Sequence, residues 1–506
     1  MSADHRKKII SSTEIVAILS PFREQGKKIV LSHGCFDLVH PGHLQSFEMA
    51  KAEGDILVVT LMTDRFVNKG PGRPVFSHPI RAGFLAAMEP IDYVVIIDQP
   101  LATEAIDLIR PDVYVKGSED GQKDSEAALE REAIEAIGGR LHFTQGETYS
   151  SSTLLNRHFD LYPAEMQLFL NEFRQKYTVE DVMKALESIR GLKVLIIGDA
   201  VVDEYHYVRP MGKTSKSNII ATRYLNGEAF SGGVFACANH LAGFCDNVHL
   251  LTVLGTQDTK EELIRSQLKK NVTPHFFYRE DGPTTVKRRY LDANFLGKLF
   301  EVYFFEDRPM ADDVEAAIHK HLEETLSEYD VVISLDYLHG LISQKTVALL
   351  SERAKFLAVN TQTNAANIGY NSILRYPKMD FACIDEPELR LATRDRFGAI
   401  EPLLRDVADA VHAKRAIVTR GHKGCLVLDE NREEKQIPVL SGKVVDAVGA
   451  GDAFLAIAAP CAATGMPMEL VGFIGNSVGA QAVTIVGNRE AVEPAPLTKA
   501  IKTMLA

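Results

Sequence analysis

The chain has 506 residues, which at roughly 150 residues per domain predicts two or three domains and excludes a single small module. Apolar residues make up 46% and charged residues 25%, values typical of globular proteins, so a disordered chain, a collagen-like repeat and a coiled-coil rod are excluded. The formal net charge of −12 argues against nucleic acids and anionic membrane surfaces as partners, but leaves nucleotides open, because helix N-termini bind phosphates inside acidic proteins.

Neither the N-terminus nor the longest uncharged stretch predicts membrane targeting. The basic residues near the N-terminus precede no apolar segment, so a secretory signal is not expected. The stretch 470–488 contains Asn476, Ser477, Gln481, Thr484 and Asn488 and predicts a buried core helix rather than a membrane span. Six scattered cysteines without a C-x-x-C pair predict reduced thiols in a cytoplasmic enzyme.

From Lys28 onward, β-rich runs alternate with helical patterns. The expected strands cover 28–33, 56–61, 92–98 and 112–117, and the expected helices cover 42–53, 79–88 and 103–109. This alternation is typical of a doubly wound parallel sheet and predicts a Rossmann-like α/β domain at residues 1–160. The segment 161–190 then predicts polar, amphipathic helices that connect two domains, with Gly191 as the stop.

A second α/β domain is expected at residues 191–506. Its first strand ends in Gly198-Asp199, and further strands are expected at 248–255, 330–335, 356–361, 416–421 and 424–430. One large domain accounts for this length.

The segment from Ser32 to His43 follows an expected strand and opens an expected helix. His40 and His43 then lie on one face at the helix N-terminus, beside unpaired N–H groups. Such a site suits phosphate, because imidazoles can donate to oxygens that gain charge when an α-phosphorus is attacked. A solvated histidine pair and a pair of zinc ligands are the alternatives, although no Cys/His cluster stands at ligand spacing nearby.

Four further segments accompany this motif: Gly70–Val75, Arg81, Asp112–Gly117 and Tyr149–Arg157. Together they resemble the cytidylyltransferase-like nucleotidyltransferases over about residues 27–160, and most of all the adenylyltransferase half of bifunctional heptose-phosphate kinase/adenylyltransferases. The resemblance implies catalytic roles for His40, His43 and Lys116. It implies nucleotide contacts for Gly34, Cys35, Phe36, Lys69, Arg73, Gly117, Ser151, Ser152 and Thr153. His33 departs from the Asn that is usual in the heptose enzymes.

A second motif, Gly449-Ala450-Gly451-Asp452, lies near the C-terminus. Glycines at a turn into a helix present N–H groups to a transferring phosphoryl, and a neighbouring carboxylate can accept the proton of an attacking hydroxyl. An ordinary loop with a helix cap is the alternative. A dinucleotide fingerprint is excluded because its third glycine is missing.

This motif follows Val194–Tyr205, Ser231–Gly233 and Val418–Leu428 in an order similar to that of ribokinase/PfkB sugar kinases over about residues 191–500. The resemblance implies that Asp452 is the base and that Gly449, Ala450 and Gly451 form the anion hole. It also implies sugar ligands at Asp199, Asp203, Gly232, Gly233 and Asn239, ATP contacts at Thr419 and Gly421, and indirect Mg²⁺ contacts at Asp385 and Glu388. Ala447 replaces the usual Thr, Asp385 replaces Asn, and Asn239 is displaced from the usual position after the two glycines.

One rival is an aminoacyl-tRNA synthetase, because HPGH and Lys213–Ser217 resemble that class's two signatures. The second signature falls inside the kinase-like unit, and nothing basic remains to bind tRNA. Gly212–Thr214 is not a P-loop either, since Tyr207 stands where a glycine is required.

The sequence thus predicts a bifunctional transferase that phosphorylates a heptose 7-phosphate at C1 and transfers an adenylyl group to a sugar 1-phosphate. The domain order is the reverse of that in the heptose enzymes. Expected partners are ATP, Mg²⁺, sugar phosphates and a separate phosphatase, with a homodimer left open. The alternatives are that one half, more readily the kinase, is a degenerate module, or that the first half is a cytidylyltransferase for another phosphorylated polyol.

Overall fold

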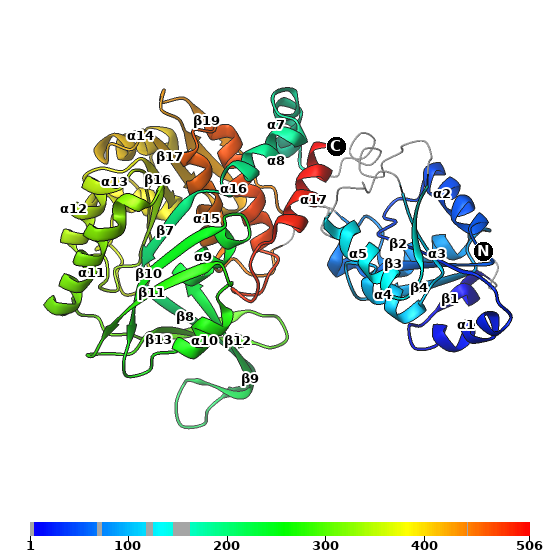
Figure 1. The fold of residues 1–506 in the computed structure, drawn as a ribbon. Helices are drawn as coiled ribbons and strands as arrows, with labels where there is room; N and C mark the ends of the chain where they lie inside the picture. The colour runs from blue at the N-terminus through cyan, green and yellow to red at the C-terminus, as the bar shows by residue number, and fades with distance from the viewer. Residues whose placement is uncertain (1–4, 68–72, 118–124, 145–161, 443) are drawn as a thin grey trace. The chain divides into compact units, whose positions relative to one another are not determined.

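The chain forms two units, each built around its own main sheet (Figure 1). A computed structural model describes residues 5–67, 73–117, 125–144, 162–442 and 444–506. Contacts within the chain group Met1–Ala164 with Lys499–Ala506 as the first unit and Glu165–Thr498 as the second.

The sheet of the first unit has six parallel strands in the order β1-β4-β3-β2-β5-β6. They are β1 (Ile9–Ile10), β2 (Ile29–Gly34), β3 (Ile56–Met62), β4 (Tyr93–Ile97), β5 (Val113–Gly117) and β6 (Arg140–Thr144). Strand β2 has β3 on one side and β5 on the other, so the strand order reverses there. In such sheets the loop at the reversal, at the carboxyl ends of the strands, is where ligands bind.

Helices cover both faces of this sheet. The apolar side chains of α2 (Pro41–Ala52) and α3 (His78–Ala86) pack on one face. Those of α1 (Ile15–Glu24), α4 (Thr103–Ile109) and α5 (Ser125–Ala136) pack on the other. The expected Rossmann-like doubly wound fold is therefore confirmed. The sequence did not reveal β1, because a two-residue strand carries no periodicity.

The main sheet of the second unit has nine strands in the order β11-β10-β7-β14-β15-β16-β17-β18-β19. They are β7 (Lys193–Gly198), β10 (Asn247–Gly255), β11 (Val272–Arg279), β14 (Val331–Asp336), β15 (Leu357–Thr361), β16 (Phe381–Asp385), β17 (Arg415–Thr419), β18 (Cys425–Leu428) and β19 (Glu434–Ile437). All pairs are parallel except the last two, β17–β18 and β18–β19. This is the expected ribokinase-like α/β sheet.

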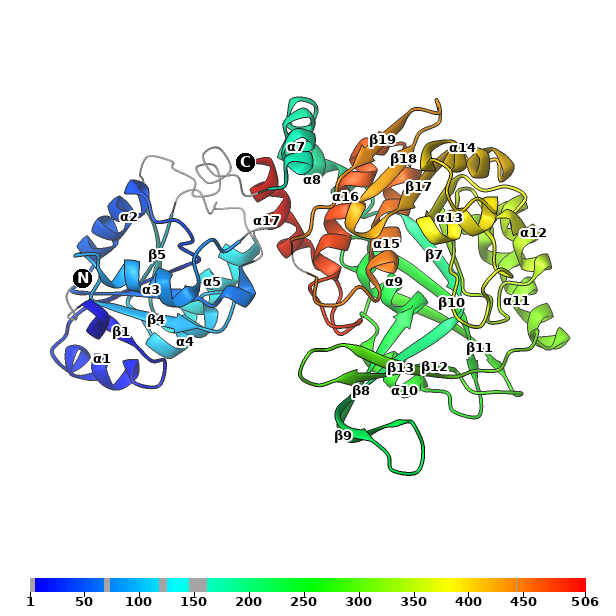
Figure 2. The same ribbon diagram turned by 180° about the vertical axis from the view of Figure 1, so that it is seen from behind.

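Two groups of helices flank the nine strands. Helices α11 (Asp312–Thr325), α12 (Gln344–Arg353), α13 (Glu386–Thr393) and α14 (Ile400–Ala410) share one apolar core and lie together in Figure 2. Helices α9 (Val234–Ala242), α15 (Ala450–Ala463) and α16 (Met468–Ala482) pack together on the other face. The expected buried helix after Leu470 is thus α16. No helix among the described residues is both long enough and apolar enough to cross a bilayer.

A second, four-stranded sheet of the order β13-β12-β8-β9 was not predicted. It comprises β8 (Ala200–Lys213), β9 (Ile220–Gly233), β12 (Thr285–Asp292) and β13 (Lys298–Phe304). The long β8–β9 hairpin extends away from the main sheet in Figure 1. The Lys213–Ser217 segment lies at the tip of this hairpin, where Thr214 Oγ1 donates to the Ser217 carbonyl at 2.6 Å, so it forms an ordinary turn.

Two helices, α7 (Ala164–Lys176) and α8 (Val179–Ser188), form in the segment expected to be a polar connector. The apolar side of α7 is buried against the second unit: the ring of Phe173 lies 4.3 Å from that of Phe473 in α16, and the ring of Phe169 lies 6.3 Å from it. These helices therefore belong structurally to the second unit.

Candidate active sites

The first candidate site lies where β2 leads into α2. His40 precedes the helix and His43 occupies its first turn, with ring centroids 3.9 Å apart. The His40 backbone N–H donates to His43 Nδ1 at 3.3 Å. The structure thus brings the two predicted imidazoles together at a helix N-terminus, where N–H groups attract anions, next to the Gly34–Phe36 segment.

A buried ion pair closes one side of this site. Arg73 Nη1 lies 2.8 Å from Asp37 Oδ2, and both side chains are fully buried. Asp37 Oδ1 also accepts the Val75 N–H at 2.6 Å. Arg73 Nε and Nη2 are buried with no hydrogen-bond partner among the described residues. Unsatisfied buried donors are costly, so these two nitrogens suit an anionic ligand that would supply the missing acceptors.

The predicted catalytic Lys116 stands at the end of β5, just before Gly117, and forms an ion pair. Its Nζ lies 2.7 Å from Glu130 Oε2, and both side chains are less than a tenth exposed. Glu130 belongs to α5 and also accepts the Ala102 N–H at 3.2 Å. To bind a phosphate, the Lys116 ammonium would therefore have to leave Glu130 or contact Glu130 and the phosphate at the same time.

Two other residues of the first motifs have structural roles. Arg81 donates to the carbonyl of Cys35, to the Phe76 carbonyl at 2.9 Å and to Asp64 Oδ1 at 2.6 Å, so it fixes the loop after β2. Burial lowers the pKa of His33 to about 4, and its Nδ1 lies 2.9 Å from Thr60 Oγ1. The predicted contacts Lys69, Ser151, Ser152 and Thr153 lie outside the described residues.

The second candidate site is centred on Asp452 in the first turn of α15. This side chain is only 7% exposed, and burial raises its pKa to about 7. Its Oδ1 accepts hydrogen bonds from Tyr337 Oη at 3.0 Å and Gln362 Nε2 at 2.8 Å. A carboxylate whose pKa is raised to about 7 and that lies in the first turn of a helix can take a proton from a hydroxyl in attack on a phosphoryl group.

Two glycines of the predicted motifs allow the close approach of Asn488 and Asp203. Gly449, directly before α15, has φ +81°, and a Cβ there would overlap the side-chain oxygen of Asn488. At Gly232 a Cβ would overlap Asp203 Oδ2, and that same oxygen accepts from Asn488 Nδ2 at 3.1 Å. Asn488 therefore links the predicted sugar side of the site to the predicted anion hole.

The two aspartates predicted as sugar ligands differ in their surroundings. Asp203 lies in β8 and pairs with Arg289 of β12, within the four-stranded sheet. Asp199 accepts the backbone N–H groups of the loop after β14, each at 3.1 Å: those of Tyr337, His339 and Leu341. Asp199 thus shapes the loop that carries Tyr337, and its role as a sugar ligand stays a prediction.

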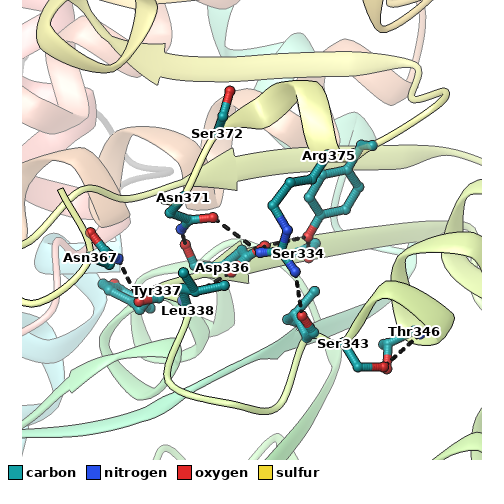
Figure 3. Close-up of polar contacts among 12 residues, drawn as sticks. Ser334, Asp336, Tyr337, Leu338, Ser343, Thr346, Asn367, Asn371, Ser372 and Arg375 are labelled. Atoms are coloured by element: carbon teal, nitrogen blue, oxygen red, sulfur yellow. Dashed lines mark hydrogen bonds and ion pairs between the residues drawn. The ribbon is translucent and has the colours of Figure 1, made fainter. Parts of the chain in front are cut away.

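A buried polar network surrounds the segment that carries Tyr337 (Figure 3), and one of its members, Asn367, also contacts the backbone of Gln362. Asp336 is fully buried, burial raises its pKa to about 6, and it pairs with Arg375 at 2.9 Å. The side chain of Asn371 accepts a hydrogen bond from Arg375 at 3.1 Å and donates one to the Asp336 carbonyl at 2.7 Å. Asn367 Nδ2 donates to the Tyr337 carbonyl at 2.8 Å and to the Gln362 carbonyl at 3.0 Å. The network fixes both segments that hold Asp452.

The predicted metal-side residues Asp385 and Glu388 form the N-terminal cap of α13. Glu388 Oε2 accepts the Asp385 N–H at 2.9 Å, and Asp385 Oδ1 accepts the Glu388 N–H at 2.8 Å. Glu388 Oε1 also accepts the Thr363 N–H at 2.9 Å, and burial raises the pKa of Glu388 to about 8. Among the described residues, no group of three His, Cys, Asp or Glu side chains is placed to hold a metal ion.

Three further predicted contacts are Thr419 and Gly421, in and after the end of a strand, and the half-buried Asn239 in a helix. Thr419 ends β17, and Gly421 follows it with φ +54° in a turn closed by the Arg420 N–H on the Gly424 carbonyl at 2.8 Å. Asn239 in α9 donates to the Gln267 carbonyl and accepts the Lys269 N–H, both at 2.9 Å, at the end of α10 (Glu261–Gln267). Its amide therefore ties α9 to α10.

Sequence reasoning missed several residues of these sites: Glu130, Lys287, Arg289, Tyr337, Gln362 and Asn488. None of them stands in the quoted motifs. Only Lys287-Arg288-Arg289 carried a signal, as three successive cations in a strand-like segment of an acidic chain.

Two family models match this chain. The model of the pfkB family carbohydrate kinases matches residues 193–495, and the cytidylyltransferase-like model matches residues 31–157. The cytidylyltransferase-like region thus precedes the kinase-like region, as the sequence motifs indicated.

Curated relatives named "Bifunctional protein HldE" match part of the chain. The protein from Syntrophotalea carbinolica is 38% identical over 148 residues, 29% of this chain and 30% of the relative. The one from Methylobacillus flagellatus is 43% identical over 120 residues, 23% of this chain and 25% of the relative. The matched region is therefore less than a third of each relative's length. Among solved structures, phosphofructokinase-2 from Escherichia coli, in complex with potassium, aligns with a TM-score of 0.51 at 15% identity. The alignment covers 62% of this chain and 99% of that one, which shows a shared fold.

Proposed function

Because the chain belongs to the pfkB family of carbohydrate kinases, we propose that its second unit transfers the γ-phosphoryl of Mg·ATP to a sugar hydroxyl. The observation that carries the proposal is Asp452, buried beside Gly449 with a pKa raised to about 7 by that burial. Asp452 accepts the hydroxyl proton as the oxygen attacks phosphorus, and the N–H groups at the start of α15 stabilise the charge on the phosphoryl.

The proposed acceptor is a heptose 7-phosphate that reacts at its anomeric hydroxyl. This choice rests on the resemblance of the first unit to heptose enzymes and on its 38–43% identity to the HldE relatives. Asp203, held by Arg289 and Asn488, is the proposed ligand of the sugar hydroxyls.

For the first unit we propose the reaction of ATP with a sugar 1-phosphate to give an ADP-sugar and pyrophosphate. The attacking phosphate is already ionised at neutral pH, so the site needs charge stabilisation rather than a strong base. His40, His43 and Arg73 supply donors around the N-terminus of α2, and Lys116 contributes once its pair with Glu130 opens.

We propose that Mg²⁺ binds at the kinase site through water. The carboxyl groups of Asp385 and Glu388 each accept backbone N–H groups yet retain oxygen lone pairs for a metal-bound water, and a nearby cation would favour the ionised form of Glu388. A bound Mg²⁺ would neutralise phosphate charge, while Asp385 and Glu388 would set its position from the start of α13.

Two partners complete the proposal. The kinase would leave a 1,7-bisphosphate, so a separate phosphatase must remove the 7-phosphate before adenylyl transfer. We also propose a homodimer, because β13 exposes Phe300, Val302 and Phe304 on one face of the four-stranded sheet. Val302→Asp should then lower the mass measured by light scattering from that of a dimer to that of a monomer. A monomeric wild-type protein would refute this part.

One experiment separates the two activities. In the full chain, Asp452→Asn should lower ADP formation by about 10²- to 10⁴-fold while pyrophosphate release continues. His43→Ala should lower pyrophosphate release by about 10²- to 10³-fold while ADP formation continues. Unchanged ADP formation in the first variant would refute the kinase assignment. If the wild-type protein forms only ADP or only pyrophosphate, one of its halves is degenerate. If it releases pyrophosphate faster with CTP than with ATP, the first unit is a cytidylyltransferase.

A further inference from the structure

Lys287 occupies the centre of the inner face of the four-stranded sheet. It lies in β12, between Asp203 of β8 and Tyr303 of β13 in register. Arg289, two residues on, faces the same way and pairs with Asp203 and Glu301. The Lys287 side chain is therefore part of the wall that also carries the proposed sugar ligand.

This lysine is buried without an anionic partner. It is 7% exposed, and among the described residues its ammonium forms no hydrogen bond and no ion pair within 4.0 Å. Its Nζ lies 5.2 Å from the ring centre of Tyr337 and 5.5 Å from that of Tyr303. Burial lowers its pKa.

The nearby carboxylates are already engaged. Asp203 is held by Arg289 and Asn488, Glu301 by Arg289 at 3.0 Å, and Asp452 by Tyr337 and Gln362. A largely desolvated ammonium that forms no hydrogen bond with the described residues is costly, and two aromatic faces and the more distant charges of the three carboxylates compensate for only part of that cost. An anionic ligand within hydrogen-bond distance would supply the acceptors that the ammonium lacks.

The position of Lys287 indicates which ligand this is. The Lys287 ammonium lies over the ring of Tyr337, and the hydroxyl of the same tyrosine donates a hydrogen bond to Asp452. The side chain of Tyr337 therefore contacts both the lysine and the proposed base. A sugar hydroxyl would supply a weak neutral acceptor, whereas a phosphoryl group supplies charged oxygens that match an ammonium.

We propose that Lys287 binds a phosphoryl group in the kinase pocket, a role that rests on the proposed kinase function. The phosphoryl is either the group in transfer or the acceptor's own phosphate. In the transfer step the acceptor oxygen forms a bond to phosphorus, the bond from phosphorus to the ADP oxygen breaks, and the hydroxyl proton passes to Asp452. Lys287 donates hydrogen bonds throughout and keeps its own protons.

The test uses the full chain with Lys287→Met, Lys287→Arg and the matched control Arg288→Met. Arg288 is the next residue of the same strand but pairs on the other face with Glu204 at 2.7 Å. Because that face also carries Val302 and Phe304 of the proposed dimer contact, light scattering must first show that Arg288→Met keeps the wild-type mass. ADP formation is measured with a heptose 7-phosphate and with the unphosphorylated heptose. Pyrophosphate release from the first unit is measured in the same samples, and an unchanged rate shows that each variant protein is intact.

Each source of the phosphoryl has its own signature. If Lys287 binds the acceptor's phosphate, Lys287→Met raises KM for the sugar phosphate by about 10- to 100-fold and leaves KM for the free sugar unchanged. If it binds the group in transfer, kcat falls by about 10²- to 10³-fold for both acceptors. In either case Lys287→Arg recovers part of the loss, and Arg288→Met leaves both parameters within about twofold. Lys287→Met kinetics within twofold of wild type for both acceptors, or a loss that Arg288→Met reproduces, would overturn the proposal.

A binding measurement keeps the proposal testable if the wild-type protein phosphorylates no sugar, a result that would refute the kinase function itself. Inorganic phosphate should raise the melting temperature of the second unit in the wild type and not in Lys287→Met. Without phosphate, Lys287→Met should melt at or above the wild-type temperature, because it removes an unpaired buried charge. Equal phosphate stabilisation of both proteins would overturn the assignment of Lys287.

Discussion

Replacing Tyr337 by Phe removes one of the two hydrogen-bond donors to Asp452 and leaves the ring in place. Burial raises the pKa of Asp452, and the two donors oppose that rise because they stabilise the ionised form. The variant should therefore hold Asp452 protonated to higher pH. Since the base must be ionised to accept a proton, kinase activity should be lost on the acid side of neutrality.

The size of the effect follows from the 3.0 Å bond between Tyr337 Oη and Asp452 Oδ1. A hydrogen bond to a charged group contributes about 1.5–3 kcal/mol, and 1.36 kcal/mol corresponds to one pKa unit, so a rise of about one to two units is expected. From a starting pKa of about 7, a rise of one unit lowers the ionised fraction at pH 7 about fivefold.

The assay is ADP formation by Tyr337→Phe between about pH 5.5 and 9.5, where the acid limb of kcat/KM should move upward by about one unit or more. Tyr376→Phe is the matched control, because this tyrosine is equally buried but donates to Asp336 at 3.1 Å rather than to Asp452. An acid limb that stays at its wild-type position in Tyr337→Phe, or that moves as far in Tyr376→Phe, would refute this account of Asp452.

Three further predictions concern other parts of the chain. Burial lowers the pKa of His240 to about 4, below the value of about 6.5 in the unfolded chain. The neutral imidazole therefore contributes ~3 kcal/mol to the free energy of unfolding above pH 6.5, and this contribution is lost as the pH falls toward 4. Urea midpoints should therefore fall less steeply over this range in His240→Gln, and parallel curves would contradict the reasoning. A fragment 162–506 should melt several degrees higher than a fragment 185–506, which lacks α7 with its aromatic contacts and most of α8; equal melting temperatures would show that these helices contribute nothing. Glu130→Gln removes the negative charge that pairs with the Lys116 ammonium and should lower KM for the nucleotide in pyrophosphate release, whereas a raised KM would show that the pair itself positions the lysine.

Local spacing was enough to predict the parts of both sites that lie at strand–helix junctions. His40 and His43 are three residues apart, and Gly449–Asp452 is one continuous turn, so each group stays together however the rest of the chain folds. The same holds for the capping box of Asp385 and Glu388.

Contacts between distant segments could not be predicted in this way. Tyr337 and Gln362 reach Asp452 from positions 115 and 90 residues earlier in the chain. The four-stranded sheet was missed for the same reason, because β8 is paired on one side by β12, about 80 residues later. Asp199 lies close to Asp203 in sequence, but it accepts backbone N–H groups of a loop about 140 residues later in the chain, which its position in the motif could not indicate.

The close contacts at Gly232 and Gly449 distinguish two ways in which a kinase unit of this kind could lose its activity and become a pseudokinase. A substitution of Asp452 would remove the proposed base but would leave Asp203 and Asn488 in place, so a relative with that change could still bind a sugar. An alanine at Gly232 or Gly449 would instead push Asp203 or Asn488 out of position, while every acidic residue of the motifs remained in place. Inspection of catalytic acids alone would misjudge such a relative as active. This chain has both glycines together with Asp452, so it carries neither of these changes.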